Sequence, residues 1–144
     1  MIIVFDFDKT LTYKDTSMGF YKSCSASCFR FYIKNIVYIP FSLLYKLNMI
    51  SNSSLKKIAL FLFLRGLTES KFDILSKSYS SKIRINTVIQ KLLFHINENH
   101  SVFIITASFS SYVSQIFKDL PVTVIGTEPF FCKGKLRSLK NNCY

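Results

Sequence analysis

The first twelve residues constrain the fold most, because a short apolar run ends in two closely spaced carboxylates. Met1 to Phe5 is apolar and rich in Ile and Val, which predicts a strand buried on both faces of a parallel sheet. Asp6 and Asp8 follow at its carboxyl end, where open α/β sheets bind ligands. On an extended backbone both side chains project to the same side, and a cation such as Mg²⁺ would relieve their repulsion. A turn that merely ends a strand is the alternative interpretation.

A second predicted strand also ends in small polar residues. Ser101 to Ile105 is apolar and β-branched, and Thr106, Ala107 and Ser108 follow before a helical pattern begins. A hydroxyl and backbone N–H groups at the start of a helix suit an anionic oxygen. The segment therefore indicates a phosphate site at Thr106 with the amides of Ala107 and Ser108, although a plain helix cap uses the same residue types.

The segment between these two strands, residues 14–85, shows helical spacing and no strand alternation. The expected boundary residues are Pro40, which would break or kink a helix, Gly66 as a C-terminal cap, and Ser53 or Ser54 and Thr68 as N-caps. Later residues predict a helix over 86–97, a strand over 122–125 and a hairpin turn at residues 133–134. Strand, helix and strand in succession favour an α/β fold with a right-handed crossover.

These features together resemble the haloacid dehalogenase (HAD) superfamily, in particular its phosphoserine-phosphatase-like subfamily IB. The stretch Asp6-Phe7-Asp8-Lys9-Thr10-Leu11-Thr12 is similar to the first family motif, Asp-x-Asp-x-Thr, and the block around Thr106 to the second. The resemblance implies a HAD-like Rossmannoid three-layer core with a parallel sheet, built from residues 1–13 and 86–144. It also implies a helical cap, residues 14–85, inserted after the first strand.

The resemblance also implies a reaction and a role for each site residue. Asp6 would be the nucleophile, and Asp8 the general acid and base. The Asp6 carboxylate and the Asp8 backbone carbonyl would hold Mg²⁺, and Thr106 would complete the catalytic set. Thr10 and the amides of Ala107 and Ser108 would bind phosphate. The expected activity is Mg²⁺-dependent hydrolysis of a small phosphorylated metabolite through an aspartyl-phosphate.

The chain departs from the family pattern in two places. Ala107-Ser108 stands where phosphoserine phosphatases usually have Gly-Gly. The resemblance therefore does not identify the substrate. Asn142-Cys143-Tyr144 resembles the stretch before the third motif, and neither the third nor the fourth motif follows it. We therefore expect weak turnover or none from these 144 residues, and self-association through an incomplete sheet edge. The alternatives are a non-catalytic HAD-fold remnant and a membrane-surface or anion-binding protein that uses the basic cap.

Charge and composition narrow the class of partner. The formal net charge is +11, and residues 14–86 carry 12 Lys and Arg against three Asp and Glu, which gives +9. Without an interleaved basic and aromatic motif, we expect no nucleic-acid binding. Residues 29–50 are long enough to cross a bilayer, but three cations and a proline interrupt them, so we expect no stable span. The four Cys are expected to be free thiols in a reducing, cytoplasmic setting.

Overall fold

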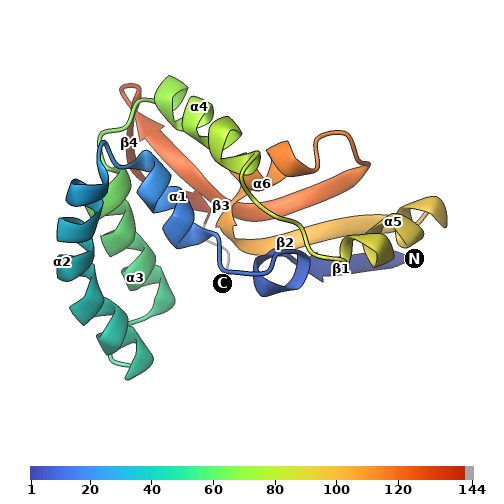
Figure 1. The fold of residues 1–144 in the computed structure, drawn as a ribbon, viewed down its shortest axis with the longest axis horizontal. Coiled ribbons are helices and arrows are strands. Elements are labelled where there is room, and N and C mark those ends of the chain that lie inside the picture. Colours follow the sequence, from blue (N-terminus) through green and yellow to red (C-terminus); the bar gives the residue numbers. More distant parts are fainter. Residues whose placement is uncertain (142–144) are drawn as a thin grey trace.

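The computed structural model describes residues 1–141 of the chain. Its elements, in chain order, are β1 (Ile2–Asp6), η1 (Phe7–Leu11), α1 (Ser17–Cys24), α2 (Cys28–Lys46), α3 (Asn52–Ala59), η2 (Leu60–Leu64), α4 (Glu69–Ser80), α5 (Ile89–Asn97), β2 (Ser101–Phe109), α6 (Ser110–Ile116), β3 (Val122–Cys132) and β4 (Lys135–Asn141). The element η2 is a single π-helical turn, whereas η1 is a kinked turn in which Asp8 and Lys9 have non-helical backbone angles. The helices α1 to α3 gather at one end of the molecule, and the N-terminus lies at the other (Figure 1).

The strands form one sheet in the order β1-β2-β3-β4. The first three strands are parallel, as predicted, and their register aligns Asp6 with Ile105 and Ile105 with Ile125. The fourth strand is antiparallel and forms the predicted hairpin with β3. Lys133 and Gly134 both have positive φ, 51° and 70°, as expected in the two-residue turns that match the twist of a hairpin. The α/β class is therefore confirmed.

Helices cover one face of this sheet. Val102 and Ile104 are buried on that face, and Leu92 of α5 and Val113 of α6 are buried with them in the core. The alternate residues point the other way, and four of them are exposed: Ile2, Val4, Ile105 and Ile125. The prediction that the first strand is buried on both faces is wrong, because β1 is an edge strand packed on one side. Residues 1–141 thus supply two of the three layers that the resemblance implies.

The segment between β1 and β2 is helical, as predicted, but two of its boundaries differ. The helix α2 continues through Pro40, so the helix does not break there, and a kink at this residue stays a prediction. The cap of α3 is Ser51, whose side chain accepts a hydrogen bond from Ser54 N, whereas Ser53 or Ser54 was expected. Thr68 caps α4 as predicted, and Gly66 follows η2 at φ +82°, as expected after a helix end.

An aromatic cluster joins this helical segment to the sheet. Phe20 of α1 packs against Phe72 of α4, and both contact Phe109 at the end of β2. Tyr112 of α6 lies 4.9 Å from Phe20 between ring centroids. Aromatic contacts of this kind bury large areas and prefer defined geometries, so they hold α1 and α4 against the carboxyl ends of the strands.

Three of the four cysteines lie in the described part of the chain. Cys24 is buried, Cys28 and Cys132 are exposed, and all three are free thiols as predicted; Cys143 lies outside the described residues.

Among residues 1–141, no helix has the length and apolar character needed to cross a bilayer.

Candidate active site

The first predicted motif forms a tight turn at the carboxyl end of β1. Phe7 and Leu11 are fully buried and anchor the turn, whereas Asp6 is exposed. Lys9 adopts a left-handed conformation with φ 63°, and its N–H donates to Thr12 Oγ1 at 3.2 Å. The Asp6 carboxylate accepts a hydrogen bond from Thr10 Oγ1 at 3.1 Å. The turn thus presents Asp6 to solvent, with Thr10, a predicted phosphate ligand, bonded to it.

Asp8 has a different environment from Asp6, because four donors surround its carboxylate. Thr16 donates to Oδ1 from its backbone N at 2.8 Å and from its Oγ1 at 2.7 Å. Ser108 Oγ and Thr106 Oγ1 donate to Oδ2 at 2.5 and 3.3 Å. The structure therefore brings three predicted residues, Asp8, Thr106 and Ser108, into direct contact across 98 residues or more of sequence.

Two tyrosines extend this network behind Asp8. Tyr112 is fully buried and its Oη lies 2.7 Å from Thr16 Oγ1, and Tyr79 donates to the Thr16 backbone carbonyl at 2.7 Å. Burial raises the pKa of Tyr79 to about 12 and holds the pKa of Tyr112 well above its ordinary value. Both phenols therefore stay neutral and keep a proton to donate at ordinary pH. Thr16 is fixed between them and Asp8.

The second motif differs in detail from the sequence expectation. The strand β2 continues to Phe109, and α6 begins only at Ser110, so Thr106, Ala107 and Ser108 extend the strand instead of starting a helix. The Thr106 hydroxyl accepts from Ser108 N at 3.0 Å while donating to Asp8. Ala107 is exposed. The predicted residues are thus assembled, but Thr106 and Ser108 contact Asp8, and their amides do not lie at a helix N-terminus.

A cleft opens beside Ser108, between the helical segment and the strand ends. Its volume is about 320 Å³, and its lining residues are Asp15, Ser17, Met18, Tyr21, Tyr38, Tyr45, Asn52, Leu55, Lys56, Ala107, Ser108, Phe109, Thr127 and Leu139. Asp15 and Lys56 are the charged side chains among them. Lys56 reaches across from α3 and donates to Thr127 Oγ1 at 3.2 Å. Burial raises the pKa of the Tyr38 phenol, so it remains a neutral hydrogen-bond donor.

A wider open depression, of about 990 Å³, lies over the linkers 12–16 and 82–85. None of the six predicted site residues lines it, so the cleft beside Ser108 is the better candidate for substrate.

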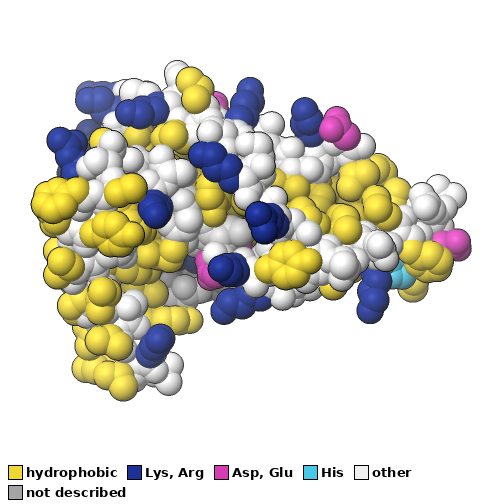
Figure 2. All heavy atoms as spheres, in the orientation of Figure 1, with side chains coloured by type: hydrophobic (Ala, Val, Ile, Leu, Met, Phe, Trp, Pro, Cys, Tyr) yellow, Lys and Arg dark blue, Asp and Glu magenta, His cyan; other side chains and the backbone are white. Residues whose placement is uncertain are grey.

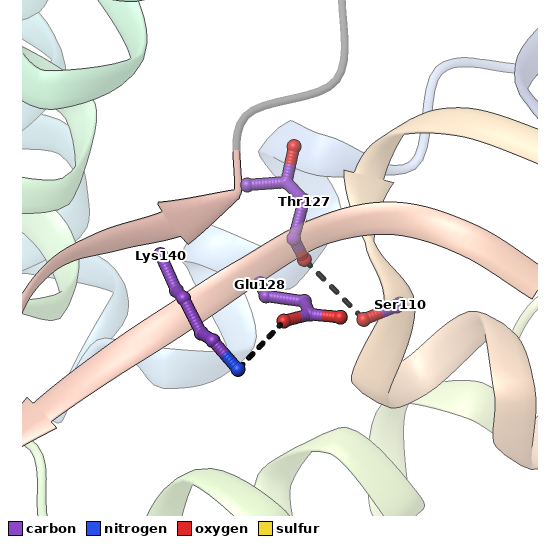
Figure 3. Close-up of polar contacts among 4 residues, drawn as sticks. All are labelled: Ser110, Thr127, Glu128 and Lys140. Carbon is purple, nitrogen blue, oxygen red and sulfur yellow. Dashed lines mark hydrogen bonds and ion pairs between the residues drawn. The ribbon is translucent and has the colours of Figure 1, made fainter.

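The hairpin of β3 and β4 closes one side of the site. Lys140, which the sequence did not place in the site, lies 3.8 Å from Glu128 between Nζ and Oε2 (Figure 3). Ser110 Oγ donates to the Thr127 backbone carbonyl at 3.5 Å (Figure 3), and Thr127 Oγ1 donates to the Ala107 carbonyl at 2.8 Å. These contacts tie β3 to the end of β2. The stretch Asn142-Cys143-Tyr144, which resembles the residues before the third motif, lies outside the described residues.

The described residues offer few ligands for a cation. Residues 1–141 contain no cluster of three or more His, Cys, Asp or Glu that could hold a metal ion. The exposed Asp6 carboxylate and the Asp8 backbone carbonyl are hard oxygen donors from one turn. Mg²⁺ commonly binds one or two carboxylates, substrate phosphate and several waters, so this pair fits a weakly held, hydrated Mg²⁺ and not a closed metal site.

The sequence did not identify four residues that shape this region. Asp15 and Thr16 stand in the polar stretch just after the first motif, and Tyr112 stands four residues after Ser108, so their positions in the sequence offered a signal. Lys56 had no such signal, because only the packing of α3 brings it to the strand ends.

The comparisons with known proteins agree with this geometry. A family model for haloacid dehalogenase-like hydrolases matches residues 3–144, and the chain therefore belongs to this family. A comparison with curated proteins finds no similar sequence.

Solved structures show the same fold at low sequence identity. A protein of unknown function from Bordetella pertussis Tohama I is 14% identical with a TM-score of 0.79, covering 99% of this chain and 67% of that one. A substrate-bound phosphoserine phosphatase is 15% identical with a TM-score of 0.67, covering 96% and 61%. A phosphoserine phosphohydrolase-like protein from Francisella tularensis subsp. tularensis SCHU S4 is 18% identical with a TM-score of 0.64, covering 97% and 64%. This chain thus spans 61% to 67% of their lengths.

Proposed function

We propose that this chain carries the catalytic half-site of a phosphoric monoester hydrolase, with residues 14–85 as a cap over a core of residues 1–13 and 86–144. The observation that carries the proposal is the contact of Asp8 with Thr106 and Ser108 beside an exposed Asp6. Two carboxylates in such different environments suit two different tasks. The phosphoserine phosphatases of the same fold support the reaction class.

In this reaction an Asp6 carboxylate oxygen attacks phosphorus, and the bond from phosphorus to the ester oxygen breaks. Asp8 gives a proton to the departing alkoxide, and then takes a proton from the water that hydrolyses the aspartyl-phosphate. The hydroxyls of Thr106 and Ser108 donate to Asp8 in this structure. When substrate binds, they would turn toward the phosphoryl oxygens. Ala107, whose backbone N–H is a predicted phosphate donor, lines the cleft beside Ser108. Bound Mg²⁺ would offset negative charge between Asp6 and the phosphate.

The cleft limits the size of the substrate. A volume of about 320 Å³ is at the lower end of the range for small-molecule sites, which suits a small phosphorylated metabolite. The Asp15 carboxylate and the Lys56 ammonium group would bind groups of opposite charge at the non-reacting end of that substrate. We propose a cytoplasmic metabolite as the substrate, because Cys24, Cys28 and Cys132 are free thiols and such thiols are typical of reducing compartments.

The test replaces each carboxylate by its amide. With an aryl phosphate and Mg²⁺, Asp6→Asn should lose activity by several orders of magnitude, as expected for a nucleophile. Asp8→Asn should slow alkyl phosphates more than aryl phosphates, because a phenolate needs less protonation to leave. Asp119→Asn, an exposed carboxylate outside the cleft, is the matched control and should retain full activity.

Activity of Asp6→Asn above about a tenth of the unmodified protein would contradict the nucleophile assignment. Of the two outcomes expected for these 144 residues, measurable weak turnover would support the proposed function, and no hydrolysis of any phosphate ester at saturating Mg²⁺ would favour the non-catalytic alternative.

A further inference from the structure

The helix α2 presents its most apolar side to solvent. Five aliphatic or aromatic residues recur at spacings of three, four and seven, which places them on one face of a helix: Phe29, Ile33, Ile36, Leu43 and Leu47, the last at its C-cap. All five are exposed, Ile36 by 69% and Leu43 by 53%. We call these five residues the α2 stripe. The helix lies at the outer edge of the helical end of the molecule (Figure 1).

The opposite side of α2, which faces the protein, is aromatic and packs against Phe63 through Phe31 and Tyr38. Phe31 is buried there, but Tyr38 and Tyr45 line the cleft with their hydroxyl-bearing rings. A surface helix of a soluble domain normally buries its apolar stripe and exposes its polar side. The helix α2 is instead apolar on both sides, and a contiguous exposed apolar surface of this kind marks an interaction site.

The apolar surface extends beyond α2. Phe61 of η2 is 57% exposed. A groove of about 420 Å³ separates α2 from α3 and η2, and it is lined by Val37, Phe41, Lys57, Ile58, Phe61 and Leu62. Met49, in the turn that follows α2, is also exposed. The surface is thus a continuous ridge and groove and not a row of isolated side chains.

The charge around this surface has one sign. Between Thr16 and Thr68 the chain has seven Lys and Arg and no Asp or Glu. Arg30 and Lys46 fall on opposite flanks of the α2 stripe by helical spacing. Beside Phe61, a second groove is bordered by Lys57, Arg65 and Arg137, and Arg65 lies over the Phe61 ring at 4.5 Å. Figure 2 shows hydrophobic and basic side chains together at the α2 end of the molecule.

These observations select one kind of occupant. A second copy of this chain would bring the same positive charges together and be repelled. An occupant must therefore combine an extensive apolar layer with negative charge. Long Lys and Arg side chains beside an apolar helix face are the pattern of helices that lie in the plane of a membrane, with charged ends reaching the headgroups. At 1.5 Å per residue the 19-residue α2 offers a contact about 28 Å long.

We infer that the α2 stripe, with Phe61 and the flanking cations, docks this protein on the surface of an anionic phospholipid bilayer. The apolar side chains enter the boundary between headgroups and acyl chains, and Arg30, Lys46 and Lys57 contact lipid phosphates. The inference concerns binding alone and does not depend on phosphatase activity.

The experiment is flotation of the full chain with vesicles, which separates bound protein from aggregates because vesicles rise and aggregates sink. Vesicles of phosphatidylcholine and phosphatidylglycerol in equal parts should carry the protein upward, and vesicles of phosphatidylcholine alone should carry much less. Ile36→Ser with Leu43→Ser should lower the partition coefficient roughly tenfold for each side chain. Lys57→Gln with Arg30→Gln should lower the partition coefficient on anionic vesicles only. Added salt should also lower the partition coefficient on anionic vesicles.

Ile74→Ser is the matched control, because Ile74 is 65% exposed on α4 and lies outside the stripe; it should bind as the unmodified protein does. Asp6→Asn should also bind normally, which separates docking from catalysis. Failure to float with anionic vesicles, or equal loss from Ile36→Ser and Ile74→Ser, would overturn the inference. Sedimentation velocity could instead show oligomers that Ile36→Ser dissociates. That result would assign the α2 stripe to a contact with a second copy and would also overturn the inference.

Discussion

Asp6 and Asp8 are separated by one residue but occupy different environments. Asp6 is exposed and accepts a hydrogen bond from the hydroxyl of Thr10, so a phosphorus atom could reach it from solvent. Asp8 is half-buried and receives four hydrogen bonds, which fix its carboxylate in place. A nucleophile requires access and an acid requires orientation. These surroundings support the proposed roles, with Asp6 as the nucleophile and Asp8 as the acid.

Thr16 is a positioning residue for Asp8 in the proposed reaction. Thr16→Val keeps the shape but removes the hydroxyl between Asp8 and Tyr112, and leaves a buried phenol without that partner. We expect kcat to fall at least about tenfold, and to fall more for alkyl than for aryl phosphates. The free energy of unfolding should fall by about 1–3 kcal/mol.

Thr16→Ser restores the hydroxyl and should recover most of both losses. Steady-state kinetics with the two ester classes and thermal unfolding measure these effects. Equal behaviour of the Val and Ser variants would show that the hydroxyl does not orient Asp8.

The three described thiols should differ in reactivity. Burial raises the pKa of Cys24 from 9.0 to about 12, so it stays a thiol where exposed cysteines begin to ionise. Alkylation at about pH 8 followed by peptide mapping should modify Cys28 and Cys132 and spare Cys24. Modification of Cys24 at a similar rate would mean that its surroundings open readily.

The same shift predicts a dependence of stability on pH. Because the folded-state pKa of Cys24 lies above its unfolded value of 9.0, its contribution to stability is complete below pH 9 and is lost as pH rises toward 12. Tyr79 acts in the same direction between its ordinary value of 10.0 and about 12. Thermal unfolding should therefore begin to weaken above about pH 9.

At the scale of elements, the site depends on how closely β3 approaches the end of β2. A Cβ on Gly126 would lie 2.9 Å from Ser108 O, 3.0 Å from Ser110 N and 3.1 Å from Thr106 Cγ2. Two of these atoms belong to the backbone and cannot move without shifting the strand. Gly126 is therefore required for the contact that places Thr106 and Ser108 at Asp8.

Gly126→Ala should destabilise the fold by about 1–3 kcal/mol, as overpacking does, and should also lower activity by displacing Ser108. Gly134→Asn is the control: nothing lies within 4 Å of its position, its φ is +70°, and Asn tolerates that conformation. Its stability should change by less than about 0.5 kcal/mol. Denaturant unfolding measures the free energy of unfolding of both variants. An equal loss in the two would show that the close approach of β3 to β2 is not what makes Gly126 necessary.

At the scale of the whole molecule, the sheet is covered on one face only in residues 1–141. Ile2 and Val4 on the edge strand, with Ile105 and Ile125 beside it, leave apolar surface exposed. An exposed edge strand with an apolar face invites pairing with another chain. The expected self-association through the sheet edge would use this surface, which lies on β1 to β3 and not on α2.

Val4→Lys tests that expectation, because a charge on an edge strand opposes pairing. We expect the dimer dissociation constant to rise about tenfold, from loss of one buried aliphatic side chain. Phe94→Lys on α5 is the matched control, with Phe94 exposed by 58% and Val4 by 54%. Sedimentation velocity over a concentration series measures both variants, and an equal shift would place the contact elsewhere.

The sequence alone determined the features that depend on neighbouring residues. The strand, the carboxylate pair and the polar end of the second strand could be read from alternation, β-branching and spacing. The hairpin at Lys133-Gly134, the Thr68 cap and the position of Gly66 followed from local backbone chemistry, and the structure confirms all three. The family motif added the expected roles of Asp6, Asp8 and Thr106.

Only the tertiary structure decided the features that depend on packing between distant segments. An apolar run does not reveal whether its strand is central or at an edge, so the exposure of Val4 was not foreseen. The position of Lys56 at the strand ends, and of Tyr112 behind Asp8, depends on how α3 and α6 pack. The outward direction of the α2 stripe was hidden for the same reason: helical periodicity identifies an apolar face, but only its neighbours determine whether that face meets the core or the solvent.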